Sequence, residues 1–143
     1  MAVLHFCVQK IFIVDDYEPF RRHLRDLIES QDDWKVCCEA SDGSEAVEMY
    51  PAAHPHLTVM DFNMPGLDGL KASRQILAKD PNAVILMVSV ILSEQLAKEV
   101  KRAGIKGFCP KTHGDCILIA IETVLRGETY FPPPFKASHA RPA

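Results

Sequence analysis

Short apolar runs alternate with stretches of helical periodicity along most of the chain. In a parallel sheet that is covered on both faces, strands are apolar at nearly every position. Four runs fit this description: residues 11–14, 57–60, 83–88 and 107–109. A fifth stretch, residues 34–40, differs because Lys35 and Glu39 alternate with apolar residues. This alternation predicts a strand at the edge of the sheet.

Helical patterns lie between these strands. Apolar residues follow the spacing of one helix face in three places: Phe20, Leu24, Leu27 and Ile28; Leu96, Val100 and Ala103; and Cys116, Ile119, Ala120 and Thr123. Asp42, with Glu45 three residues later, predicts the capped start of a helix that runs to Tyr50. Asp68 predicts the capped start of a helix over residues 69–79.

Five strand–helix units predict an α/β fold, in which a doubly wound parallel sheet, (βα)5, carries helices on both faces. The edge-like second strand favours the strand order 2-1-3-4-5. We expect three segments: an N-terminal extension (1–9), one domain (10–130) and a Pro-rich linker or tail (131–143), which holds four of the ten prolines.

Composition narrows the class of protein. The 143 residues are 48% apolar and 24% charged, which is typical of one soluble domain. The net charge of −3 excludes a strongly basic nucleic-acid binder, and no apolar run reaches the ~18–20 residues of a membrane helix. The five cysteines are odd in number and include no CxxC pair, which favours free thiols in the cytoplasm over disulfides or a zinc site.

Polar side chains stand where the predicted strands end: Asp15, Asp16, Asp61, Ser89 and Lys111. In such a fold the carboxyl ends of the strands meet at one edge of the sheet, where ligands bind. Three carboxylates beside one lysine leave an excess of negative charge, which favours a divalent cation, and all-oxygen ligands fit Mg²⁺ best. Together with a lysine and a hydroxyl, this ion forms a phosphoryl-binding set, in which a carboxylate can form an aspartyl phosphate.

Four motifs carry a family resemblance: Asp15-Asp16 after Ile-Phe-Ile-Val, Asp-Phe-Asn-Met-Pro-Gly-Leu-Asp-Gly at 61–69, Ser89 at a strand end, and Gly-Phe-Cys-Pro-Lys at 107–111. In this order and at these spacings they resemble the receiver domains of two-component response regulators, whose fold is flavodoxin-like. Residues 125–131 are similar to the end of the receivers in regulators of the LuxR/NarL type.

The resemblance implies roles for individual residues. Asp61 is the expected phosphoacceptor. Lys111 and Ser89 are the expected contacts of the phosphoryl oxygens, and Ser89 with Phe108 is the expected conformational switch. The expected ligands of Mg²⁺, or of Mn²⁺ as the alternative ion, are Asp15, Asp16, Asp61 and the backbone carbonyl of Asn63.

The resemblance also implies a function. The module would accept a phosphoryl group from a sensor histidine kinase or a phosphotransfer protein and change conformation to relay the signal, here to transcription. It would not be an enzyme beyond self-phosphorylation and slow self-dephosphorylation. A homodimer is an expected state, DNA binding would need an effector domain that these residues lack, and no membrane contact is expected.

Two alternatives stay open. A degenerate receiver would act only as a protein-interaction module. A haloacid-dehalogenase-like phosphatase would also use an Asp nucleophile and Mg²⁺, but it needs an acid two residues after the nucleophile, where this chain has Asn63. Within the receiver family, Val90 stands where Ala or Gly is usual, so we expect it to narrow access to Asp61.

Overall fold

The computed structural model describes residues 7–112 and 114–131 of the chain. Its strands are β1 (Gln9–Val14), β2 (Trp34–Ala40), β3 (Leu57–Asp61), β4 (Ile85–Ser89) and β5 (Gly107–Pro110). Its helices are α1 (Glu18–Glu29), α2 (Gly43–Ala53), α3 (Gly69–Lys79), α4 (Glu94–Arg102) and α5 (Gly114–Leu125). The predicted N-terminal extension up to residue 6 and the predicted tail from residue 132 lie outside the described residues.

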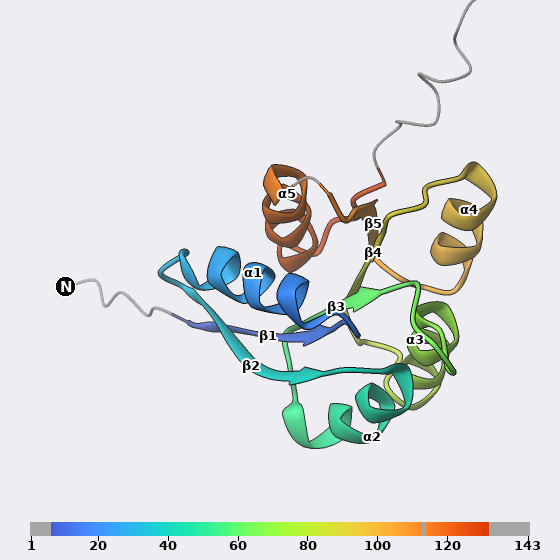
Figure 1. Cartoon of the computed structure of the whole chain (residues 1–143), viewed down its shortest axis with the longest axis horizontal. Coiled ribbons are helices and arrows are strands. Elements are labelled where there is room, and N and C mark those ends of the chain that lie inside the picture. Colours follow the sequence, from blue (N-terminus) through green and yellow to red (C-terminus); the bar gives the residue numbers. More distant parts are fainter. Residues whose placement is uncertain (1–6, 113, 132–143) are drawn as a thin grey trace, which may run out of the picture.

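The strands form one sheet in the order β2-β1-β3-β4-β5, and every neighbouring pair is parallel (Figure 1). The predicted doubly wound, flavodoxin-like (βα)5 fold and its strand order are therefore confirmed. In the described part of the chain, no helix has both the length and the apolar character needed to cross a membrane.

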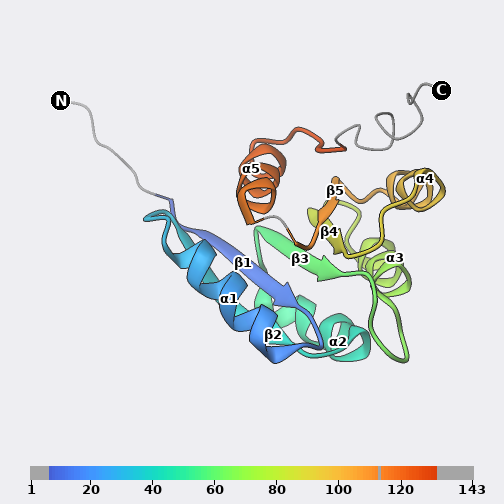
Figure 2. The same ribbon diagram turned by 45° about the horizontal axis from the view of Figure 1, so that its top comes forward.

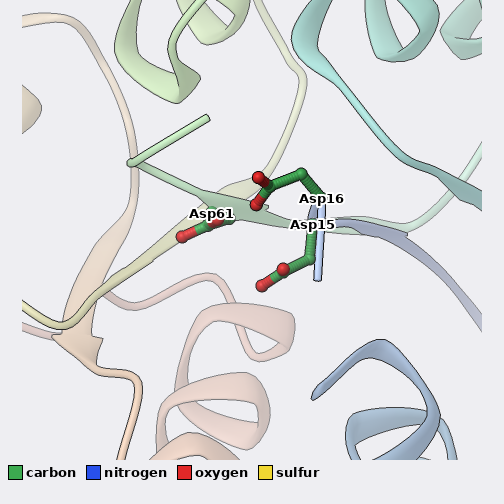
Figure 3. Close-up of side chains that lie close together, drawn as sticks. All are labelled: Asp15, Asp16 and Asp61. Carbon is green, nitrogen blue, oxygen red and sulfur yellow. The ribbon is translucent and has the colours of Figure 1, made fainter. Parts of the chain in front are cut away.

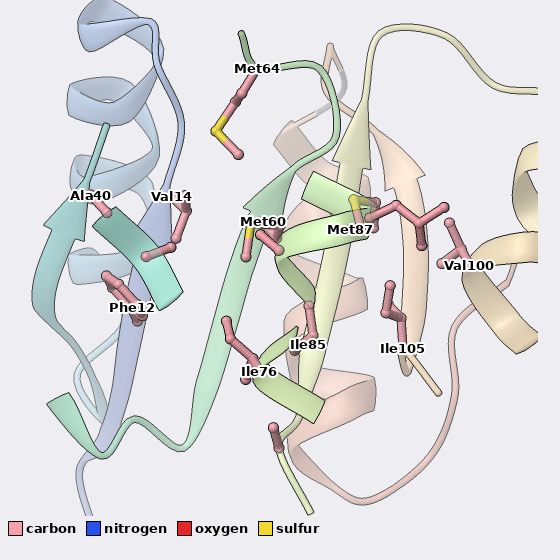
Figure 4. Close-up of a cluster of buried hydrophobic side chains, with 14 of the residues drawn as sticks. Phe12, Val14, Ala40, Met60, Met64, Ile76, Ile85, Met87, Val100 and Ile105 are labelled. Carbon is pink, nitrogen blue, oxygen red and sulfur yellow. The ribbon is translucent and has the colours of Figure 1, made fainter. Parts of the chain in front are cut away.

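Helices cover both faces of the sheet, with α1 and α5 on one face and α2, α3 and α4 on the other (Figure 2). Each face has its own core, because successive side chains of a strand point in opposite directions. In β1, Ile11 and Ile13 pack beneath α1 and α5. Phe12 and Val14 pack in the core of the opposite face (Figure 4). This two-sided burial is the reason why the central strands lack polar alternation.

The predicted starts of α2 and α3 are confirmed. Asp42 and Asp68 each accept a hydrogen bond from the backbone N–H three residues later, at 2.7 and 2.8 Å. Glu45 completes the first of these caps from the other side, because its carboxylate accepts hydrogen bonds from the backbone N–H and the hydroxyl of Ser41. These caps satisfy amides that the first turn of a helix leaves without partners.

The predicted end of α2 at Tyr50 is wrong by three residues. The helix continues through Pro51 to Ala53, and His54 ends it in the left-handed conformation with φ 46°. Pro51 has no N–H to donate, but the last turn is closed by the N–H of His54, which donates to the carbonyl of Tyr50 at 3.1 Å.

The predicted buried face of α5 is also wrong. The buried residues are Ile117, Ala120, Ile121 and Val124, which is the predicted stripe displaced by one residue, or ~100° around the helix. Ile119, a member of the stripe that predicted this helix, is 53% exposed. The cause is that apolar residues surround most of this helix, so periodicity alone does not distinguish the face that meets the sheet.

The chain returns to the sheet after α5. The backbone N–H of Phe108 in β5 donates to the carbonyl of Tyr130, and the N–H of Tyr130 donates to the carbonyl of Lys106, both at 2.9 Å. Phe131, where the tail is predicted to begin, still packs against the core beneath α4, with the ammonium of Lys101 5.3 Å from its ring centroid.

Close packing between α3 and β3 generates a test of the fold. A Cβ atom at Gly69 would lie 2.1 Å from the backbone oxygen of Asp61, so Gly69→Ala must displace the start of α3. We expect it to lower the free energy of unfolding by about 3 kcal/mol, measured by urea unfolding. Gly114→Ala is the matched control, because Gly114 also begins a helix and its added Cβ would meet nothing closer than 3.5 Å. The control should be neutral or up to ~1 kcal/mol more stable, and equal losses in both variants would contradict the clash.

Candidate functional site

Three carboxylates from two neighbouring strands meet at the carboxyl edge of the sheet (Figure 3). Asp15 and Asp16 directly follow β1, and Asp61 is the last residue of β3, the strand that pairs with β1. One oxygen from each carboxylate lies within 4.8 Å of the others. Asp15 and Asp61 are each 1% exposed, whereas Asp16 faces solvent. Residues 46 positions apart therefore form one acidic cluster because the strands that carry them are adjacent.

Among the described residues, Lys111 is the cation that forms ion pairs with the carboxylates of Asp15 and Asp61. Its Nζ lies 2.8 Å from Asp15 Oδ2 and 3.5 Å from Asp61 Oδ2. The backbone N–H of Lys111 donates to the carbonyl of Ser89, which fixes the end of β5 beside β4. Phe20 of α1 supports the ammonium from the other side, with 4.7 Å between Nζ and the ring centroid.

Phe20 and Arg21 were not expected at this site. Arg21 donates from Nη1 to the backbone oxygen of Asp15 at 2.7 Å, and its Nε pairs with Glu39 of β2 at 3.0 Å. Arg21 thereby ties the loop that carries the acidic pair to the edge strand. The sequence indicates Phe20 only as part of an apolar helix face. No local pattern predicts the pairing of Arg21 with Glu39, which lies 18 positions away.

The charges in the cluster do not balance. The pKa of Asp61 is raised to about 7, mainly by burial and then by the charge of nearby Asp15. The ammonium of Lys111 and the backbone N–H of Asn63 act in the opposite direction but do not cancel these effects. An additional cation beside Asp61 would stabilise its ionised form.

The free oxygens of the cluster suit a divalent cation. Oδ1 of Asp15 accepts a hydrogen bond from the N–H of Tyr17 at 2.8 Å, and Oδ1 of Asp61 accepts a long one from Asn63 at 3.4 Å. Apart from the ion pair with Lys111, the buried Oδ2 atoms of both aspartates have no partner among the described residues. Clustered carboxylate oxygens without donors are the ligands that Mg²⁺ and other hard cations take.

The remaining predicted site residues lie around this cluster. Ser89 ends β4 beside Asp61, but its hydroxyl donates to the carbonyl of Ile91 at 2.7 Å and accepts from the N–H of Ile91 at 3.0 Å. Asn63 is exposed in the loop after β3. Phe108 is 2% exposed and packs in the core beneath α4, so its ring already occupies an inward position.

The raised pKa of Asp61 predicts a pH-dependent stability. In metal-free buffer the folded state resists ionisation of Asp61 between its ordinary pKa of 3.8 and about 7, so wild-type stability should fall as pH rises through this range. Asp61→Asn should abolish that fall and raise the free energy of unfolding at pH 7 by on the order of 2 kcal/mol.

Urea unfolding at pH 4.5 and pH 7 measures the effect. Asp68→Asn is the control, because asparagine keeps the cap acceptor of α3 while one carboxylate is removed. Its stability should stay within ~0.5 kcal/mol of wild type. Lower stability of Asp61→Asn at pH 7 would contradict the account of the charges.

Known proteins share this fold and sequence pattern. The transcriptional regulatory protein DegU of Brevibacillus brevis is 28% identical over 131 residues, which cover 91% of this chain but only 55% of DegU. The chemotaxis protein CheY of Listeria monocytogenes is 35% identical over 114 residues, covering 79% of this chain and 95% of CheY. The crystal structure of a LuxR-family two-component response regulator from Aurantimonas sp. SI85-9A1 superposes with a TM-score of 0.86 at 32% identity, covering 92% of this chain and 94% of that one.

The family itself is settled by a match over most of the chain. Residues 11–121 fit the response regulator receiver domain. The resemblance seen in the motifs is confirmed, including the relationship to regulators of the LuxR family. This chain therefore belongs to the response regulator receiver domain family.

Proposed function

We propose that this receiver domain accepts a phosphoryl group on Asp61 and relays that event to a partner by a change of conformation. The observation that carries the proposal is the placement of Asp61. Its carboxylate is buried, lies 3.5 Å from the ammonium of Lys111 and stands beside the acidic pair Asp15 and Asp16. A nucleophile, a fixed positive charge and a set of metal ligands are the parts that phosphoryl transfer to a carboxylate requires.

The transfer needs little movement of the protein. An oxygen of Asp61 forms the new bond to phosphorus while the bond from phosphorus to the imidazole nitrogen of a phosphohistidine donor breaks, and the imidazole takes up a proton. Lys111 would exchange part of its ion pair with Asp15 for contacts with the phosphoryl oxygens. Since Lys111 is held by Ser89 and Phe20, its ammonium is positioned before the donor arrives.

Receiver domains bind Mg²⁺ at an acidic pocket, and the cluster here has the ligands for it. The residues that would hold Mg²⁺, or Mn²⁺, are Asp15, Asp16, Asp61 and the backbone carbonyl of Asn63. When bound, the ion neutralises charge on the carboxylates and on the phosphoryl oxygens.

The relay would begin at Ser89. Its hydroxyl is engaged by Ile91, so a phosphoryl oxygen on Asp61 must compete with two hydrogen bonds inside the loop after β4. When the hydroxyl of Ser89 bonds to the phosphoryl oxygen in place of Ile91, the loop after β4 moves toward Asp61. A differential interaction of this kind shifts a two-state equilibrium by about 1–3 kcal/mol. Phe108 is already buried here, so the change we propose at the switch is a repacking of Phe108 against α4 and not its entry from solvent.

The phosphoryl donor would be a sensor histidine kinase or a phosphotransfer protein. Tyr17, Val90 and Ile91 are each more than half exposed in the loops that follow β1 and β4, which leaves an apolar rim beside the acidic cluster. Tyr17 and Val90 also border a hollow of about 400 Å³ that reaches Lys111 and Phe20. An apolar rim around a charged centre suits a protein donor better than a small anion alone.

The output and setting follow from the relatives and the thiols. DegU is a transcriptional regulatory protein of which this chain spans about half, so we propose that the signal reaches transcription through an effector domain, with DNA contacted only there. All five cysteines are free, which suits the cytoplasm. A homodimer stays a prediction, and Ile119 is the large apolar side chain that α5 exposes toward such a partner.

A receiver that binds partners without being phosphorylated is the competing function, and mass spectrometry separates the two. Incubation with a small phosphodonor and Mg²⁺ should add the mass of one phosphoryl group to the intact chain. Asp61→Asn and excess chelator should each abolish the adduct, because one removes the nucleophile and the other the cation. Asp68→Asn should keep it. A wild-type chain that forms no adduct, or an adduct that persists in Asp61→Asn, would overturn the proposal.

Access to Asp61 gives a kinetic prediction. Val90→Ala removes both γ-methyl groups from the rim of the hollow beside Lys111, so phosphorylation by a small phosphodonor should become about two- to fivefold faster. Ile91→Ala is the control, because Ile91 is equally exposed but does not line that hollow. Unchanged rates in both variants would show that Val90 does not limit access.

A further inference from the structure

Two adjacent cysteines of the edge strand β2 turn their thiols toward each other. In a regular strand, successive side chains point to opposite faces, which keeps such neighbours apart. Here the pairing with β1 slips by one residue, because Ile11 pairs with Val36 and Phe12 pairs with Cys38. Cys37 is the extra residue of a β-bulge, a distortion that redirects a side chain. As a result, the Sγ atoms of Cys37 and Cys38 lie only 3.7 Å apart.

The thiol pair is reachable from solvent. Both cysteines are free and only partly buried. They border a shallow hollow of about 340 Å³ whose other walls are the last turns of α2, with Met49, Ala52 and Ala53. Met49 carries a further soft sulfur into the same lining, and none of the described residues that border the hollow is charged. The sulfur atoms in this lining favour a thiophilic cation over a hard one that takes oxygen ligands alone.

The distance between the sulfurs allows a weak S–H···S contact between the two thiols and is also compatible with a shared cation. Two thiolates bound to one tetrahedral cation with bonds of ~2.3 Å have sulfurs about 3.8 Å apart. The observed 3.7 Å separation matches this value without movement of the strand. A disulfide would require the sulfurs to approach to ~2.05 Å, which the extended backbone of neighbouring residues opposes.

We propose that Cys37 and Cys38 form a two-thiolate binding site for a soft d¹⁰ cation of the zinc and cadmium class, separate from the acidic cluster. On binding, each thiol loses its proton to solvent and forms one sulfur–metal bond, and no electron is transferred. The remaining coordination positions open into the hollow beside Met49, where water completes them. The site rests on the bulge of β2 and does not depend on phosphorylation of Asp61.

The protonation of Cys38 gives this site a pH dependence. Burial is the largest cause that raises the pKa of Cys38 to about 12, followed by its contact with Cys37. Lys10 lowers this pKa and Glu39 raises it, and both effects are smaller. A cation must therefore displace a proton from Cys38 at neutral pH, so its affinity should increase as the pH rises.

Cadmium titration tests the site. A chain with Cys7→Ser and Cys116→Ser serves as the reference, since it keeps the pair and removes the two other cysteines that are not fully buried. In excess Mg²⁺ and a phosphine reductant, Cd²⁺ should bind this reference at one ion per chain, with the ultraviolet charge-transfer absorption of thiolate ligands. Adding Cys37→Ser or Cys38→Ser should each weaken binding at least tenfold.

Controls separate loss of the site from loss of the fold. The unfolding midpoint without Cd²⁺ shows whether a variant is folded, and Cys37→Ala provides a second variant with the same expected loss. Binding that survives in the folded Cys37→Ser and Cys38→Ser chains, or that is already absent from the reference, would overturn the proposal. Asp61→Asn should bind Cd²⁺ as the reference does, so failure of this site and failure of phosphorylation are distinguishable.

Discussion

The repulsion between two buried carboxylates is the interaction around which this domain is organised. Asp15 and Asp61 are both removed from water at the ends of neighbouring strands, and one ammonium lies between them. Such a group of charges is tolerated only where the surrounding structure holds it rigidly and a cation can complete it. Arg21 braces the loop after β1, and Phe20 holds Lys111 in place. A cation that binds beside these carboxylates would relieve their repulsion, so its binding would stabilise the domain.

The sheet creates this arrangement through its topology. Parallel strands place their carboxyl ends along one edge, and the central position of β1 and β3 brings their final residues together. Gly69 then allows α3 to begin directly against the backbone of Asp61. A hydrophobic core covers each face of the sheet. We expect conformational change in the loops that follow the strands, where the hydroxyl of Ser89 can exchange its hydrogen bonds with Ile91 for others.

Features that depend on local sequence pattern could be predicted, whereas features that depend on contacts between remote parts of the chain could not. The strands and their polar ends followed from apolar runs, because buried parallel strands leave little choice of residue. The strand order followed from the edge-like alternation of residues 34–40 together with the family resemblance. The capped starts at Asp42 and Asp68 followed from side chains that act within one turn. The buried face of α5 could not be identified from the sequence, because apolar residues surround most of the helix and their spacing does not single out one face. The pairing of Phe20 with Lys111 and the slip at Cys37 depend on elements that are remote in sequence.

The return of Tyr130 to β5 has a consequence for how copies of this domain meet. A sheet that ends in a free strand invites another strand to join it, which is the route to aggregation. At the β5 edge, the backbone N–H of Phe108 already donates to the carbonyl of Tyr130, and Pro110 has no N–H to donate. At the β2 edge, the bulge distorts the strand, and the charged side chains of Lys35 and Glu39 oppose pairing with a further strand. Association by sheet extension is thus discouraged at both edges of the sheet, so we expect copies of this domain to meet through other surfaces, such as the helices.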